Sequence, residues 1–287
     1  MSLTTLATQV LNGVSFGGLL FLVSSGFTLI FGLLRVVNLA HGALYLVGAY
    51  VGIATYTATS SFVLGAAAAA GSVALLGIGL ERTVLRRVRG RELSEVLLTV
   101  GVSLVLADLC LALFGGDPKQ VDVPSALAGS VTLGGFAYPR YRLFVAALAI
   151  ALAVVLYVLT QRTKLGATIR AGVDDREIAN ALGVDISRVF TGVFAFGAAL
   201  AGLAGFIGGG MLAILPGADV DILLLALVVV IVGGLGSVKG AAIGSLLIGL
   251  IDAFSKAWIP DLAYFTVFAP MALLLLLRPS GLFGKAA

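Results

Sequence analysis

Side chains that could carry acid–base, metal or covalent chemistry are few in this sequence. It contains one histidine, His41, and one cysteine, Cys110. A metal site needs several N, S or O ligands, and a serine hydrolase needs a base held beside an activated serine. A lone histidine and a lone thiol meet neither requirement. The sequence therefore predicts no catalytic residue, no metal site, no cofactor and no disulfide framework.

Nucleotide chemistry is also missing from the sequence. The phosphate-binding pattern G-x-x-x-x-G-K-[ST] does not occur. Two acids, Asp108 and Asp252, lie within or beside apolar runs, where an ionised group is costly and is a functional candidate by default. Asp108 precedes a Gly-Gly turn and Asp252 is near a helix end, so we favour interfacial acids in contact with water. Any energy for the function must therefore come from elsewhere.

The composition indicates a protein that lies in a lipid bilayer. Of the 287 residues, 60% are hydrophobic and 11% are charged, and the mean hydropathy is +1.14. Soluble domains have roughly 45–50% apolar and about 25% charged residues. We expect an all-α, polytopic membrane helix bundle that forms a single domain over residues 1–287. The net charge of +4 does not indicate nucleic-acid binding, because the basic residues lie in short loops.

Apolar runs predict eight or nine transmembrane or re-entrant segments, since about 20 residues of helix cross a bilayer. Two short runs flank a Gly-rich turn at 233–237, so these two are half-helices, a re-entrant pair or full crossings. The predicted runs are 10–34, 39–59, 62–80, 96–114, 143–160, 189–215, 222–232, 241–251 and 264–277.

Basic residues in short loops predict the orientation, because cytoplasmic loops are rich in Lys and Arg. The loops 81–95 and 161–188 each carry five Arg or Lys residues. Arg35 and Lys285 fall on the same side if nine segments cross. We therefore expect the N-terminus outside and the C-terminus in the cytoplasm.

Small residues spaced by four predict tight helix packing, because close backbone approach supplies the contact between helices in lipid. A substrate path lined by glycine is the alternative interpretation. The pairs are Gly13 and Gly17, Gly48 and Gly52, and Gly240 and Gly244, with a longer ridge of Gly197, Ala201, Gly205 and Gly209.

The segment 28–50 breaks the apolar pattern with polar residues. Asn38, His41 and Gly42 open a new helix after Gly32. Asn38 is either the N-cap of that helix or, with His41 and Gly42, part of a polar break near a transport pathway. The stretch resembles the LivH-type permeases of bacterial branched-chain amino acid ABC importers, which carry a similar G-x-x-R-V-V-N-x-A-H-G sequence.

The loop 161–188 is the second segment that carries this resemblance. It is long for a bare connection, and its acids open a short helix that Gly183 ends. Either it is a solvated loop or it is a docking element. Glu177 to Gly183 resembles the E-A-A-x-x-x-G loop of ABC importer permeases, with Ile178 in place of alanine. The resemblance implies coupling to an ATPase through Arg170, Asp174, Asp175, Arg176, Glu177, Ala179 and Gly183.

Further similarity to the family covers the Gly-rich segment 232–237 and the C-terminal segment 278–284. The resemblance implies a multi-pass permease subunit of the bacterial inner membrane that is not itself an enzyme. It implies four kinds of partner: a second, LivM-like permease subunit, two cytoplasmic ATPase subunits, a periplasmic substrate-binding protein and membrane lipid, with no nucleic acid.

Two alternatives to import of branched-chain amino acids stay open. Permeases for urea or short amides have similar segments. An autonomous secondary transporter or channel is a different class, and it would need buried ionisable residues to couple transport to an ion gradient.

Overall fold

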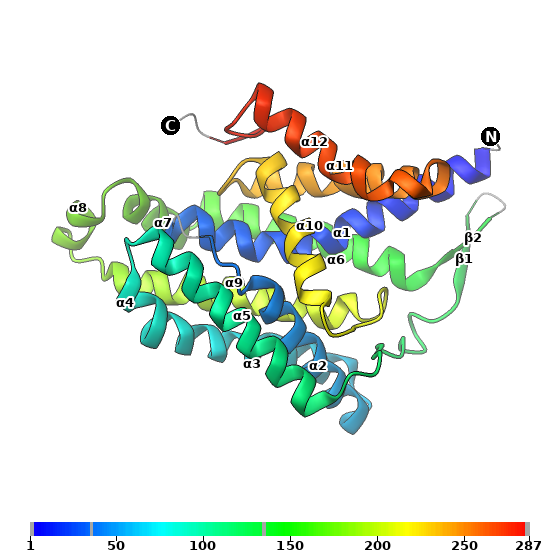
Figure 1. Ribbon diagram of the computed structural model, residues 1–287, viewed down its shortest axis with the longest axis horizontal. Coiled ribbons are helices and arrows are strands. Elements are labelled where there is room, and N and C mark those ends of the chain that lie inside the picture. Colours follow the sequence, from blue (N-terminus) through cyan, green and yellow to red (C-terminus); the bar gives the residue numbers. More distant parts are fainter. Residues whose placement is uncertain (1–2, 35–36, 134–135, 285–287) are drawn as a thin grey trace.

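Helices occupy most of the chain (Figure 1). The computed structural model describes residues 3–34, 37–133 and 136–284. Within these ranges, seven helices are long and apolar enough to cross a membrane, and the last of them includes the short η2 (Pro260–Leu262). They are α1 (Leu3–Leu34), α3 (Phe62–Leu80), α5 (Glu92–Phe114), α6 (Arg140–Arg162), α9 (Ile186–Gly208), α11 (Val238–Trp258) and α12 (Ala263–Leu277).

Two further helices complete the predicted bundle. α2 (His41–Thr59) is less apolar because it carries a histidine and three tyrosines. α10 (Ala218–Gly233) has only 16 residues, and it runs across the direction of α1 and α11 (Figure 1). The prediction of an all-α bundle with eight or nine segments is thereby confirmed, and the transverse course of α10 fits the half-helix alternative.

Two predicted segment bounds are wrong. The run 241–251 was expected to be short, yet α11 extends over 21 residues from Val238 to Trp258. Lys239 and Gly240 at its start, and Asp252, Ser255 and Lys256 near its end, lower the apolar content of α11 without breaking the helix. The run 189–215 overshoots, because α9 ends at Gly208 and a turn with Pro216 follows.

Helices α1 and α9 form the centre of the bundle. α1 packs against α11, α9 and α6, while α9 packs against α3 and α2. In its most apolar stretch α1 is 78% buried and α9 is 67% buried, whereas α5 and α12 are each 11% buried. α3, α5, α6 and α12 therefore present most of their apolar surface outward, as helices facing lipid or another subunit do.

The predicted small-residue pairs lie where the helix backbones meet. A Cβ at Gly26 would overlap the carbonyl oxygen of Gly197, which joins α1 to α9. A Cβ at Gly17 would lie 3.1 Å from the Cα of Leu246 in α11. At Gly48, a Cβ would overlap the backbone of Gly202 in α9. The packing interpretation of these glycines is confirmed.

The two ends of the bundle carry different structures. At one end lie η1 (Glu81–Leu85), α4 (Arg86–Val88), α7 (Lys164–Asp174) and α8 (Arg176–Ala181), on the left in Figure 1. At the other end lie the N-terminal part of α1 and an antiparallel hairpin of β1 (Ser130–Leu133) and β2 (Phe136–Pro139). The two Arg-rich loops thus share one end. Arg35 and Lys285, used to predict the orientation, lie outside the described residues.

Candidate functional site

The segment that was expected to couple to an ATPase forms a helix–turn–helix at one end of the bundle. Asp175 is the N-cap of α8, and its Oδ1 accepts a hydrogen bond from the backbone N–H of Ile178 at 2.9 Å. Gly183 ends the turn after α8 with φ of +85°, a conformation that favours glycine. Asp185 caps α9 in the same manner, through the N–H of Arg188 at 3.1 Å. The predicted start and end of this helix are therefore confirmed.

Helix α8 has an inner and an outer face. Ala179 is 3% exposed and packs with Ile186 and Phe190 of α9. On the outer face, Ile178 is 59% exposed and Leu182 is 79% exposed. Two large apolar side chains pointing into water are costly, so this face is suited to contact another protein.

The remaining residues predicted for coupling occupy different positions. Glu177 is exposed on α8, and Arg170 donates a hydrogen bond from Nη1 to the carbonyl oxygen of Thr160, which ties α7 to the end of α6. Asp174 ends α7 and Arg176 begins α8, and for these two residues the structure describes the backbone alone.

The break between α1 and α2 holds the residues predicted to lie near a pathway. His41 is fully buried, its Nε2 is 3.0 Å from the carbonyl oxygen of Val23, and its ring meets Phe27 edge to face at 5.4 Å. Gly42 lies against the backbone of Asp219 at the start of α10, with no room for a Cβ. Helices α1, α2 and α10 are therefore packed closely around this break.

Asn38 is not the N-cap of α2. That position belongs to Ala40, which makes no side-chain cap, and the Oδ1 of Asn38 accepts instead from the N–H of Ala40 at 3.1 Å. Asn38 thus forms a local turn two residues ahead, as asparagine commonly does before a helix. The Nδ2 of Asn38 and the Nδ1 of His41 are buried without a hydrogen-bond partner among the described residues.

The two membrane acids noted in the sequence differ in environment. Asp108 is exposed on the outer side of α5. Asp252 is 8% exposed and accepts from the ammonium group of Lys256 at 2.8 Å, so its charge is paired within α11. Sequence reasoning missed three other buried acids, Glu81, Glu95 and Asp219, which are 0%, 5% and 4% exposed. Glu81 directly follows an apolar run, and Glu95 and Asp219 closely precede one; that position is the signal that could have drawn attention to them.

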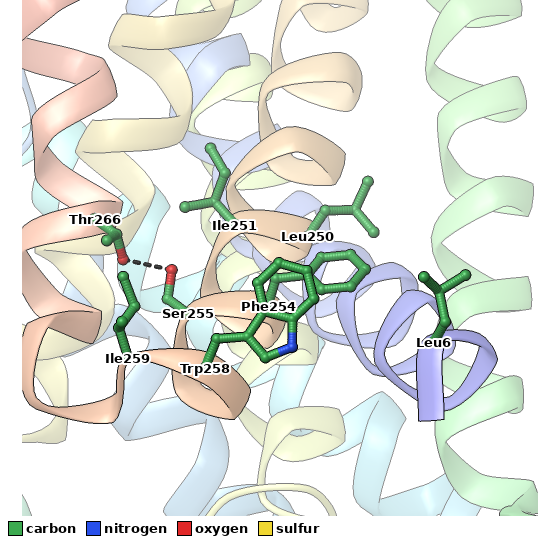
Figure 2. Close-up of a pocket in the computed structure, with 8 residues that line it drawn as sticks. All are labelled: Leu6, Leu250, Ile251, Phe254, Ser255, Trp258, Ile259 and Thr266. Carbon is green, nitrogen blue, oxygen red and sulfur yellow. Dashed lines mark hydrogen bonds between the residues drawn. The ribbon is translucent and has the colours of Figure 1, made fainter. Parts of the chain in front are cut away.

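An open groove lies on the outside of the bundle, between α1, α11 and α12 (Figure 2). Its volume is about 550 Å³, and its lining is apolar apart from the hydroxyls of Ser255 and Thr266, which are joined by a hydrogen bond of 2.6 Å. Trp258 and Phe254 cover its outer part (Figure 2). None of the predicted pathway residues lies in it.

Two segments that resemble the permease family contact each other. The backbone N–H groups of Leu282 and Phe283 donate to the carbonyl oxygens of Val232 and Gly233, each at 3.0 Å. These carbonyls belong to the last turn of α10 and have no partner within their own helix. The C-terminal segment 278–284 therefore completes the end of the transverse helix.

One pentapeptide, Gly13 to Gly17, has the G-x-S-x-G spacing of a hydrolase nucleophile. It lies inside α1 and not at a strand-to-helix turn. The hydroxyl of Ser15 is hydrogen-bonded to that of Tyr138 at 3.1 Å, while His41 bonds to Val23. No Ser–His pair forms between these residues, and within the described chain no group of three potential metal ligands occurs.

The described residues form a bundle of membrane-spanning helices with a short capped helix at one end, an arrangement suited to a membrane permease subunit. The family "Branched-chain amino acid transport system / permease component" matches residues 9–277, and the chain belongs to this family. It is a multi-pass membrane protein and a permease component of a transport system.

Curated relatives agree over nearly the whole chain. The high-affinity branched-chain amino acid transport system permease protein BraD of Pseudomonas aeruginosa is 28% identical over 96% of this chain and 95% of its own length. The corresponding permease LivH of Escherichia coli K12 is 27% identical over the same shares. A probable branched-chain amino acid transport permease, LivH of Methanocaldococcus jannaschii, is 28% identical over 85% of this chain and 80% of its own length. No solved structure gives a significant match.

Proposed function

We propose that this chain is the permease subunit of an ATP-binding-cassette importer for branched-chain amino acids in the bacterial inner membrane. Support comes from the family match over residues 9–277 and from relatives whose names carry this substrate. The pathway forms between this single-domain chain and a second, LivM-like permease subunit. A periplasmic binding protein delivers leucine, isoleucine or valine, and two cytoplasmic ATPases supply the energy.

The outer face of α8 is the observation that carries the coupling proposal. Ile178 and Leu182 extend from a helix that Asp175 and Gly183 delimit, at the same end as the Arg-rich loops. In this proposal the two side chains enter a groove of the ATPase, and the charged residues of 170–177 surround them. Closure of the ATPase dimer displaces α8, and α9 transmits the displacement because only a short turn separates them.

The break between α1 and α2 is the second part of the proposal. Among the described residues, Asn38 and His41 each keep one buried polar nitrogen without a partner, and Gly42 lets α10 approach α2 closely. Buried unpaired polar groups are costly, so a change of conformation that gives them partners is favoured. We propose that this break rearranges during transport and lies beside the pathway.

The coupling proposal is tested with Leu182→Asp in the complete complex, reconstituted with its binding protein in liposomes. A charge at this apolar contact should lower ATP-driven leucine uptake at least about tenfold, which corresponds to about 1.4 kcal/mol of lost contact energy. Leu212→Asp is the matched control, because Leu212 is 36% exposed in the turn after α9, at the opposite end of the bundle. Normal uptake with Leu182→Asp would refute the docking assignment.

The substrate and the transporter class need a separate measurement. Unlabelled isoleucine and valine should compete with leucine uptake, whereas urea and acetamide should not. Uptake by this chain alone, independent of ATP and driven by an ion gradient, would instead establish a secondary transporter.

A further inference from the structure

Glu81 is a fully buried carboxylate held by two donors from different parts of the chain. Its side chain is 0% exposed and lies in the single π-helical turn that follows α3. Oε1 accepts from the guanidinium of Arg89 at 2.5 Å, and Oε2 accepts from the hydroxyl of Thr191 in α9 at 2.6 Å. Both carboxylate oxygens thus accept a hydrogen bond, and Glu81 links the connection between α3 and α5 to α9.

Stability alone is a weak explanation for this arrangement. Removing a carboxylate and a guanidinium from water costs several kcal/mol, and apolar side chains of similar size often stabilise as well or better. A π-helical turn is also less favourable than the α-helix it interrupts, and such turns are frequent at functional sites. A fully buried carboxylate on a π turn, with both of its oxygens bonded, is therefore more suited to fixing the relative position of two elements.

The Glu81 cluster is continuous with the helix α8. Ala179 of α8 packs with Ile186 and Phe190 in the first turns of α9. The ring of Phe190 lies under the guanidinium of Arg89, 4.8 Å from its carbon to the ring centroid. Thr191, the next residue, bonds to Glu81. A path of direct contacts thus runs from α8 through the start of α9 to the end of α3.

The connection that follows the π turn is also bonded to α5. Glu95 is 5% exposed, and its Oε1 accepts from the backbone N–H of Gly90 at 2.8 Å. Leu85 of the π turn packs with Phe194 of α9 and Ile30 of α1. The connection between α3 and α5 is therefore bonded on both sides and is not a loose loop, and a displacement of α9 must carry it along or break the Glu81 bonds.

We propose that Glu81, with Arg89 and Thr191, is the positioning cluster that transfers movement of α8 and α9 to α3 and α5. This inference rests on the proposed coupling role of α8. When an ATPase displaces α8, the start of α9 moves with it, and the bonds of Glu81 draw the ends of α3 and α5 in the same direction. Without the cluster, α9 moves without α3 and α5, and a smaller share of ATP hydrolysis is converted into transport.

The test uses the complete reconstituted complex and measures leucine uptake per ATP hydrolysed. Glu81→Gln keeps the shape but removes the charge, and Thr191→Val removes only the hydroxyl. Arg87→Gln is the control for the loss of a charge nearby, because Arg87 is exposed on α4, which directly follows the π turn. Thr57→Val is the control for the hydroxyl, since Thr57 bonds only to the carbonyl of Ile53 in its own helix at 2.9 Å.

The expected result is a fall of about five- to tenfold in uptake per ATP for Glu81→Gln and for Thr191→Val, as for a coupling energy of ordinary size. The double variant should fall no further than either single variant, because both remove the same link. Thr191→Ser, which restores the hydroxyl, should restore the ratio, and the two controls should keep it.

An unchanged ratio in Glu81→Gln and Thr191→Val overturns the inference, even if either variant lowers the yield or the melting temperature. Leu182→Asp in the same assay separates this failure from that of the proposed function. If Leu182→Asp abolishes uptake while the Glu81 and Thr191 variants stay coupled, only the positioning role is refuted. If Leu182→Asp transports normally, the coupling role of α8 fails, and the inference fails with it.

Discussion

Replacement of Gly48 by alanine should destabilise the protein through one backbone contact. A Cβ at this position would lie 2.5 Å from the carbonyl oxygen of Gly202 and 2.7 Å from its carbonyl carbon, where ordinary contacts begin at 3.4 Å. Neither partner is a side chain that can rotate away, so α2 and α9 must separate by about 1 Å, and overpacking of this kind costs about 1–3 kcal/mol.

The control for Gly48→Ala is Gly71→Ala in α3. A Cβ at Gly71 meets nothing within 4 Å, so the substitution adds no overlap. There the change should stabilise by about 0.5–1 kcal/mol, because alanine loses less backbone entropy than glycine in a helix. The two variants are thus expected to shift the free energy of unfolding in opposite directions, so that they differ by about 1.5–4 kcal/mol.

The measurement is equilibrium unfolding in mixed micelles, with helicity followed as the SDS fraction rises. Gly48→Ala should unfold at a lower SDS fraction than the wild type, and Gly71→Ala at an equal or higher one. Equal stability of the two variants would refute the reasoning, since it would mean that α2 and α9 do not meet through their backbones at this point.

Two further predictions follow from contacts at the bundle ends. Gly281→Ala should lower the free energy of unfolding by about 1–3 kcal/mol more than Gly90→Ala, as measured by SDS unfolding. Both glycines have positive φ, but only Gly281 lies against the end of α10. Tyr141→Phe should lower the free energy of unfolding by about 1 kcal/mol, because it deletes the 2.7 Å hydrogen bond from the hydroxyl to the carbonyl oxygen of Ile207 at the end of α9. Tyr264→Phe, at a residue that is 76% exposed, should leave the free energy of unfolding unchanged in the same assay. A neutral Gly281→Ala or Tyr141→Phe would contradict the corresponding contact.

The membrane-spanning helices were largely predictable because their signal is local. A run of about 20 apolar residues has to be a helix in lipid, whatever its neighbours are. The caps of α8 were predictable for the same reason, since Asp175 and Gly183 act on their own turns. The coupling and pathway roles assigned to such residues stay predictions.

The features that sequence reasoning missed depend on contacts between distant segments. Glu81 follows an apolar run and precedes several arginines, a position that is typical of an acid at the membrane interface. The hydrogen bond from Thr191, 110 residues later, forms only in the folded chain. The carbonyls at the end of α10 are bonded by Leu282 and Phe283 of the C-terminal segment, about 50 residues later in the chain. The N-cap alternative for Asn38 is wrong, because its Oδ1 bonds to the N–H of Ala40 and Ala40 itself is the N-cap of α2.

At glycines of α1, α2, α9 and α11, backbone meets backbone, as at Gly26 and Gly197, Gly48 and Gly202, and Gly17 and Gly249, and such contacts have almost no side-chain conformational entropy to lose or gain. Glycine has no side-chain rotamers to fix, so ordering it on folding costs backbone conformational entropy alone. For the same reason the four helices have few alternative rotamers with which to accommodate a sliding motion. Conformational change during transport is therefore expected to carry them as one body together with α3, whose Ala69 carbonyl also meets Gly202 of α9, while α5 and α12 adjust around them.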